Sequence, residues 1–299
     1  APPGSPQNSK CSSGNIGGSV SDLTSKQDIV TDPQLQSIIK TLHQFVTNEN
    51  CAVALEIALP EISFSTHLNG TKQFQAASIL KLPIAMAIEE QSQRGELDLH
   101  ETHQLSEVLN QSRAHSVLRG LVSSQTITTE ELLRVMLIAS DELASFQLRT
   151  ILNTQHVNTL ITESGCLETY LSEVIGPVSV LGKTSANDAL RLMSIATSEA
   201  LFPTCASALK TSILNSRIPL GAKEFDISLL HKTGSLAGIA NDVAELTTED
   251  GFLRIAFLTE NQTDTVLTGY KMGLCTREIL AACGVSVKST RSIMMDSNV

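Results

Sequence analysis

The order of hydrophobic patterns along the chain constrains the fold more than any other feature. Strand-like alternation occurs near both ends of the chain, at 51–59, 62–68, 227–231, 240–247 and 253–259. Helical spacing occurs at 33–46 and 265–283, and between the two groups of strands at 78–94, 128–139, 142–152, 157–164 and 187–198. The strands from the two ends are expected to meet in one sheet, which predicts an α+β fold of two interleaved lobes.

The same patterns predict the domain boundaries. Residues 1–30 are rich in Ser, Gly, Pro and Asn and are expected to form a flexible leader. A single domain is expected over 31–285. It would consist of an α/β lobe at about 31–75 and 216–285 and a helical lobe at about 76–215. Residues 286–299 are expected to form a loose tail.

Charge and composition exclude several classes of function. The 21 Lys and Arg against 31 Asp and Glu leave a net charge of −10, which argues against nucleic-acid binding and attraction to anionic membranes. The longest apolar stretches contain Lys or Pro and are too short to span a bilayer. The six cysteines form no C-x-x-C pair, so buried thiols are expected, or one or two disulfides if the protein is exported.

Two histidines and the absence of common motifs bear on cofactors. His100 and His103 lack a third ligand and the spacing of zinc proteases, so we expect surface histidines. The sequence also lacks a P-loop, a G-x-G-x-x-G motif and a G-x-S-x-G elbow. We expect no metal and no cofactor.

The first segment that contains candidate catalytic residues is Ser78-Ile79-Leu80-Lys81, at the start of a helix. Residues three apart share a helix face, so the Lys81 amine can reach the Ser78 hydroxyl. A serine becomes a nucleophile when an adjacent base accepts its proton, and a partly desolvated lysine can serve. Alone, the S-x-x-K pattern also fits a helix with a solvated lysine. Pro83 is unusual because it would remove a hydrogen bond in the second helical turn.

Two further segments follow in a characteristic order. Ser140-Asp141-Glu142 lies between two helical patterns, where Ser140 by itself would read as a helix N-cap. Lys232-Thr233-Gly234-Ser235 lies at the end of a strand, where it offers a cation, two hydroxyls and backbone N–H groups. The order S-x-x-K, S-D-x, K-T-G is that of penicillin-recognising serine enzymes.

The flanking residues strengthen the comparison. The segments 76–83 and 231–244 resemble the nucleophile helix and the third motif of class A β-lactamase-like proteins, and the resemblance covers about residues 33–285. It implies an antiparallel sheet flanked by helices, as in β-lactamases and D,D-peptidases, with an inserted all-α lobe.

The resemblance also implies roles for the motif residues. Ser78 would be the acylated nucleophile, Lys81 its proton acceptor and Ser140 the relay to the leaving nitrogen. The substrate carboxylate would be bound by Lys232, Thr233 and Ser235, with Gly234 between them. The backbone N–H groups of Ser78 and Ser235 would form the oxyanion hole.

Two departures from the family pattern limit the inference. Glu142 replaces the usual Asn, and an ionised carboxylate cannot donate to a substrate carbonyl, so Glu142 is expected to pair with Lys81 or to accept from another substrate group. The segment 166–184 lacks the E-x-x-L-N loop whose Glu activates the deacylating water. Glu168 and Glu173 are the nearby carboxylates, and both fit solvated loop residues better than a base.

These observations favour a serine acyl hydrolase acylated on Ser78 by D-Ala-D-Ala peptides or β-lactams, with poor deacylation. One alternative is a true β-lactamase with a non-standard base. The other is a catalytically impaired protein of the same fold that binds a ligand or partner. The expected partner is a small molecule or a peptidoglycan peptide, with no nucleic acid and no membrane span. The resemblance implies an exported protein, and the sequence leaves the oligomeric state open.

Overall fold

The computed structural model describes residues 32–111, 115–122, 124–173 and 181–288. The expected leader at 1–30 lies outside these residues, as does the expected tail from 289 onward. Residues 286–288 are held against the connection before the last three strands, since Ser286 O accepts from Asp226 N at 2.8 Å and Lys288 N donates to Glu224 O at 2.8 Å.

A five-stranded antiparallel sheet in the order β2-β1-β10-β9-β8 forms the centre of the molecule. Its strands are β1 (Cys51–Leu59), β2 (Ile62–Leu68), β8 (Ser228–Leu236), β9 (Ile239–Thr247) and β10 (Phe252–Thr259). The pairing of Cys51 with Thr259 and of Ala58 with Phe252 joins β1 to β10. The expected meeting of N- and C-terminal strands in one sheet is therefore confirmed.

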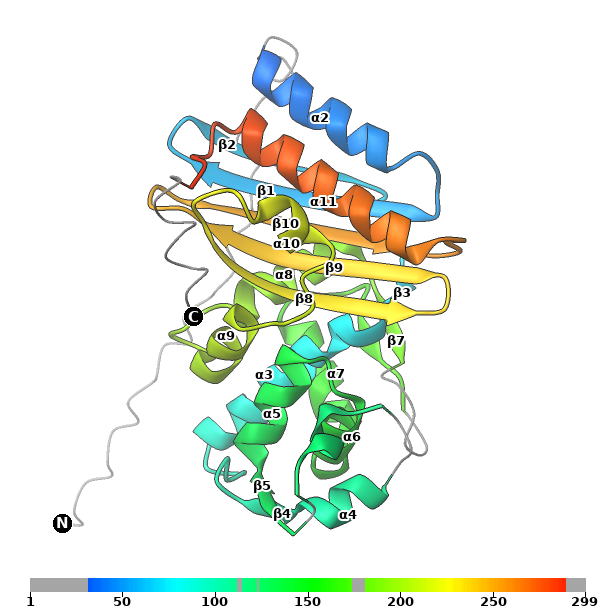
Figure 1. Ribbon diagram of the computed structural model, residues 1–299, viewed down its shortest axis with the longest axis vertical. Helices are drawn as coiled ribbons and strands as arrows, with labels where there is room; N and C mark the ends of the chain where they lie inside the picture. The colour runs from blue at the N-terminus through cyan, green and yellow to red at the C-terminus, as the bar shows by residue number, and fades with distance from the viewer. Residues whose placement is uncertain (1–31, 112–114, 123, 174–180, 289–299) are drawn as a thin grey trace, which may run out of the picture.

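Three helices cover one face of this sheet: α2 (Pro33–Phe45), α10 (Ile218–Ala222) and α11 (Thr265–Ala282) (Figure 1). The other face is covered by α8 (Ala186–Ala196) and the helical lobe. Strand β1 is apolar on both sides because alternate residues enter different cores. Ala52 and Ala54 join the core shared with the helical lobe, whereas Val53 and Leu55 join the core beneath α2 and α11.

The helical lobe lies between the two halves of the sheet in sequence and beside the sheet in space (Figure 1). Its helices are α3 (Lys81–Gln93), α4 (Leu105–Asn110), α5 (Thr129–Ile138), α6 (Glu142–Ile151), α7 (Thr154–Glu163) and α9 (Pro203–Lys210), with the 3-10 turns η1 (Ala77–Leu80) and η2 (Val117–Gly120). Two small sheets accompany them: β3 (Phe74–Gln75), β7 (Gly182–Thr184) and β6 (Tyr170–Leu171), and β4 (Thr102–Gln104) with β5 (Thr126–Thr128).

Local sequence signals explain several helix starts. Thr128 and Glu131 form the expected capping box at α5. The helix expected at 78–94 is divided, because 77–80 form a 3-10 turn and α3 begins at Lys81. Pro83 therefore lies in the first turn of α3, where its missing N–H would have no intrahelical acceptor, and not in the second turn as expected from the sequence.

Within the described residues, no helix is both long and apolar enough to cross a bilayer. The cysteines of the described segments, Cys51, Cys166, Cys205, Cys275 and Cys283, are all free thiols.

Candidate active site

Ser78 lies in the 3-10 turn that precedes α3, where only 8% of the residue is exposed. The preceding residue, Ala77, has a φ of +50°, a left-handed conformation that is uncommon for a residue with a Cβ. The buried Asn241 side chain on β9 holds this turn by donating to Gln75 O at 2.8 Å and Ala76 O at 3.3 Å. The position of the serine is therefore fixed by the sheet as well as by its own helix.

Gly234 on β8 allows the strand to approach the turn that carries Ser78. A Cβ at this position would lie 2.7 Å from Ala76 O and 3.3 Å from Ala77 Cβ, both closer than ordinary contact. The K-T-G segment thus uses its glycine for close backbone approach.

The Lys81 side chain is fully buried and points between α5 and α6. Its Nζ donates to Ser140 O at 2.6 Å and to Glu142 Oε1 at 2.7 Å, and lies 3.4 Å from Ser140 Oγ. Burial lowers the pKa of Lys81 below its ordinary value, whereas the Glu142 carboxylate opposes this shift. Burial therefore favours the neutral amine, which can act as a base, whereas Glu142 favours the charged amine of the ion pair.

Ser140 lies between Lys81 and Lys232, the two lysines of the motifs. It lies between α5 and α6 with a φ of +55°, and its Oγ accepts from Lys232 Nζ at 2.8 Å. Asp141 caps α6 by accepting from Ala144 N at 3.0 Å, and it accepts from Val117 N at 2.8 Å. Asp141 thus fixes the loop, while Ser140 faces the two lysines. The N-cap of α6 is Asp141 and not Ser140.

Lys232 is 1% exposed and has two hydrogen-bond acceptors, Ser140 Oγ and Thr233 O, the latter at 2.9 Å. Burial lowers the pKa of Lys232 well below its ordinary value, and the nearby Lys81 lowers it further. The K-T-G segment lies in the last part of β8, which ends at Leu236 before the turn to β9, as expected from the sequence. An anion bound near both amines would relieve the repulsion between Lys81 and Lys232.

Glu142, which replaces the Asn of the S-D-N motif, lies beside both Lys81 and Ser78. Its Oε1 accepts from Lys81 and lies 3.5 Å from Ser78 Oγ. Its Oε2 is buried without a hydrogen-bond partner among the described residues. The ion pair with Lys81 confirms one of the two arrangements expected from the sequence.

Arg217 is a site residue that sequence reasoning missed. Its guanidinium donates to Gly234 O at 3.0 Å and Ser235 Oγ at 2.6 Å, and burial lowers its pKa while Asp242 opposes that shift. Arg217 precedes α10 and is followed by Ile218-Pro219-Leu220, a context with no catalytic pattern. Only the packing of α10 against α11 and β9 reveals its position.

The two loop carboxylates, Glu168 and Glu173, follow Cys166 in the chain. The backbone of Glu168 is bonded to the Asp188 and Gln73 side chains, and Glu173 is exposed. Within the described residues, no hydrogen bond or ion pair joins either carboxylate to Ser78 or Lys81. The loop residues 174–180 lie outside the described part of the chain.

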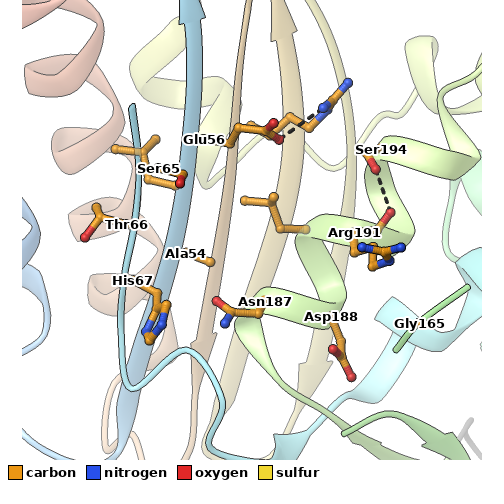
Figure 2. A pocket seen from close by; sticks show the side chains of 13 residues that line it. Ala54, Glu56, Ser65, Thr66, His67, Gly165, Asn187, Asp188, Arg191 and Ser194 are labelled. Carbon is orange, nitrogen blue, oxygen red and sulfur yellow. Dashed lines mark hydrogen bonds and ion pairs between the residues drawn. The ribbon is translucent and has the colours of Figure 1, made fainter. Parts of the chain in front are cut away.

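A separate hollow of about 650 Å³ lies over β1, β2 and α8 (Figure 2). Its lining includes Glu56, His67, Asp188 and Arg191, and none of the motif residues. The Glu56 carboxylate is paired with Arg254 at 3.1 Å. The hollow is therefore distinct from the cluster of motif residues around Ser78.

Comparison with known proteins places this geometry in a family. The model of the β-lactamase enzyme family (Beta-lactamase2) matches residues 36–273. The chain belongs to this family. By family it is a β-lactamase-like serine hydrolase, and the comparison with curated proteins gives no match.

Solved structures show the same fold. A β-lactamase from Sphaerobacter thermophilus DSM 20745 is 23% identical, with 83% of this chain and 97% of that chain covered and a TM-score of 0.73. PBP-A is 16% identical, with coverages of 83% and 96% and a TM-score of 0.70. A β-lactamase from Xanthomonas campestris pv. campestris str. ATCC 33913 is 14% identical, with coverages of 83% and 97% and a TM-score of 0.70. These structures confirm the expected α+β fold of an antiparallel sheet flanked by helices. The family-model match confirms the family expected from the motifs.

Proposed function

We propose that the protein is a penicillin-binding, D,D-peptidase-like serine hydrolase that is acylated on Ser78 and releases the acyl group slowly. The single observation that carries this proposal is the Lys81–Glu142 ion pair beside the nucleophile. It keeps a carboxylate where the family's Asn would donate to substrate, and it favours the charged form of the lysine that must act as base.

In the proposed acylation, Ser78 Oγ attacks the carbonyl carbon of a D-Ala-D-Ala peptide or a β-lactam. The Oγ proton passes to neutral Lys81, and the backbone N–H groups of Ser78 and Ser235 stabilise the oxyanion. Ser140, which lies within hydrogen-bond reach of both lysines, carries a proton to the leaving nitrogen as the C–N bond breaks. Lys232, Thr233 and Ser235, with Arg217 bonded to Ser235, bind the substrate carboxylate.

Slow deacylation follows from the surroundings of the acyl-enzyme. Hydrolysis needs a water and a base within about 2.6–3.2 Å of it. The described part of the loop brings neither Glu168 nor Glu173 into contact with Ser78, whereas Glu142 is already engaged by Lys81. The acyl-enzyme is therefore expected to persist. Because peptidoglycan peptides lie outside the cytoplasmic membrane, the proposed substrate requires export of the protein.

A second candidate function is supported by one distance. Glu142 Oε1 lies 3.5 Å from Ser78 Oγ, so this carboxylate could activate a water near the ester once acylation has displaced the Ser78 proton. The protein would then be a β-lactamase with a non-standard base.

Intact-mass spectrometry after mixing with a fluorescent penicillin separates these functions. A mass increase equal to the penicillin that persists for tens of minutes is expected. Hydrolysis of ampicillin on the order of the ~10 s⁻¹ median of enzymes would instead support the β-lactamase. Absence of any adduct or turnover, for both penicillin and a D-Ala-D-Ala peptide, would overturn both and favour the impaired protein. Ser78→Ala is the control for labelling at other residues.

A further inference from the structure

Glu142 places a negative charge beside the nucleophile that the proposed acylation does not otherwise use. Its Oε1 lies 3.5 Å from Ser78 Oγ and accepts from Lys81 Nζ at 2.7 Å. Its Oε2 is buried and has no hydrogen-bond partner among the described residues. An ionised carboxylate has about four acceptor positions and no donor. Glu142 therefore has unused accepting capacity, and it cannot donate a hydrogen bond to a substrate.

The other motif residues leave the acyl side of the substrate for Glu142 to meet. In the proposed acylation the substrate carboxylate, on the leaving-group side of the scissile bond, lies at the K-T-G segment, whose Ser235 Oγ accepts from Arg217 at 2.6 Å. The partners of Glu142 among the described residues are Lys81 and Ser78. We therefore expect Glu142 to face the group that is transferred to Ser78.

An amino group on the carbon next to the scissile carbonyl falls within reach of this carboxylate. Standard bond lengths place that nitrogen roughly 2.5 Å from the carbonyl carbon. The same carbon bonds to Ser78 Oγ during acylation, and Oγ lies 3.5 Å from Glu142 Oε1. A protonated amine there can donate to Oε1 in a charge-assisted hydrogen bond. An acylated amine is uncharged, and its carbonyl oxygen would meet the carboxylate as a second acceptor.

A substrate ammonium beside Glu142 would also change the state of Lys81, whose side chain is fully buried. Burial lowers the pKa of Lys81, whereas Glu142 and, more weakly, Asp141 raise it. The nearby Arg149 lowers the pKa of Lys81 slightly. A second cation paired with Glu142 would compete for the carboxylate and repel the charged lysine, which favours the neutral amine. The substrate itself would thus help to produce the base that accepts the Ser78 proton.

We propose that the site selects acyl donors with a free ammonium group on the carbon next to the scissile carbonyl, such as a D-alanyl group whose amine is unblocked. Glu142 binds this ammonium, and Lys81 accepts the proton of Ser78. Donors whose amine is acylated lack the charge that pairs with Glu142 and react more slowly. The inference rests on the proposed acylation of Ser78 and names the substrate class of that site.

The test uses two thioesters, D-alanyl-D-thiolactate and N-acetyl-D-alanyl-D-thiolactate, at about pH 6, below the usual pKa of an α-amino group. Both carry the same carboxylate and the same leaving group, so they differ in the charge of the amine. Ser78 Oγ bonds to the carbonyl carbon, its proton passes to Lys81, and the C–S bond breaks to release the thiol. Loss of the thioester absorbance measures this step without interference from the protein's own thiols, and Ser78→Ala gives the uncatalysed rate.

The full-length protein is expected to react at least tenfold faster with the free amine than with the acetylated amine, compared as second-order rates. Glu142→Gln should reduce this ratio at least tenfold. Glu245→Gln, which removes a carboxylate paired with Arg254, should change the ratio less than twofold. Melting temperatures would verify that both variants are folded.

The outcomes separate this inference from the proposed function. A ratio near one in the natural protein would overturn the selectivity, as would a preference for the free amine that Glu142→Gln leaves unchanged. Labelling of Ser78 by penicillin in the same preparation would show that the proposed function stands in either case. If neither thioester nor penicillin acylates Ser78, the proposed function is wrong, and the selectivity falls with it.

Discussion

Replacing Glu142 by Gln removes the negative charge beside Lys81 while keeping the shape of the side chain. The two charged groups are 2.7 Å apart, and Lys81 is fully buried. Since Glu142 favours the charged form of Lys81, its removal should lower the pKa of Lys81 further. The neutral amine, which is the form that accepts the Ser78 proton, then becomes populated at lower pH.

The expected size of the effect follows from this geometry. At an effective dielectric constant of 20, two unit charges 2.7 Å apart attract by about 6 kcal/mol, which is an upper limit because the Glu142 side chain is 26% exposed. Hydrogen bonds to charged groups contribute a net ~1.5–3 kcal/mol. That range corresponds to roughly a 10- to 100-fold larger fraction of neutral Lys81 wherever the amine is mostly charged. Because a weaker base also transfers protons more slowly, we expect a net gain of about tenfold in acylation.

The assay is the second-order rate of acylation by a fluorescent penicillin, measured from pH 5 to 10. For Glu142→Gln the ascending limb of the profile should move to lower pH, and Glu142→Asn, which also restores the family's amide donor, should gain at least as much. Glu245→Gln is the matched control, because it removes a half-buried carboxylate whose ion-pair partner is Arg254 and not a motif residue. If both Glu142 variants acylate tenfold more slowly than the natural protein, the carboxylate itself is the base and the reasoning is wrong.

Four further predictions concern the remaining machinery. Ser78→Ala should abolish penicillin labelling, and Lys81→Ala should slow it by about 10²- to 10⁴-fold, as measured by mass spectrometry; labelling that survives Ser78→Ala would exclude the nucleophile. Arg217→Lys should lower the acylation rate at low penicillin concentration about tenfold, since one ammonium cannot replace a guanidinium that bonds two groups of the K-T-G segment; an unchanged rate would argue against this role. Gly234→Ala should leave the protein folded by circular dichroism but reduce labelling more than tenfold, because its Cβ displaces the nucleophile turn; full activity would contradict the close approach. Asn241→Ala should destabilise the protein by about 3 kcal/mol in urea unfolding, since it leaves buried backbone groups without partners; a loss below about 0.5 kcal/mol would show that water replaces them.

Periodicity alone located the principal elements. The strands expected at 51–59 and 62–68 have these bounds in the structure, and the capping box at Thr128 begins α5 as expected. These segments bury an alternating or periodic face, so side-chain pattern and secondary structure coincide. The small sheet of β3, β6 and β7 was not expected, because strands of two or three residues are too short to show a period.

The sequence also identified side chains that the structure brings into one hydrogen-bonded cluster. Ser78, Lys81, Ser140 and Lys232 belong to motifs whose order and spacing carry information without coordinates. The sequence also showed that Glu142 replaces the family's Asn, and an ion pair with Lys81 was one of the two arrangements expected for it. The assigned roles of these residues stay predictions until they are tested chemically.

Tertiary structure alone decided that Arg217 belongs to the site. Arg217 reaches the K-T-G segment because α10 packs against α11 and β9, and nothing in its neighbours along the chain signals this. A sequence pattern reports which face of an element is buried, because burial repeats with the geometry of that element. Contacts between groups far apart in sequence depend on how the elements dock, and no local period encodes that arrangement.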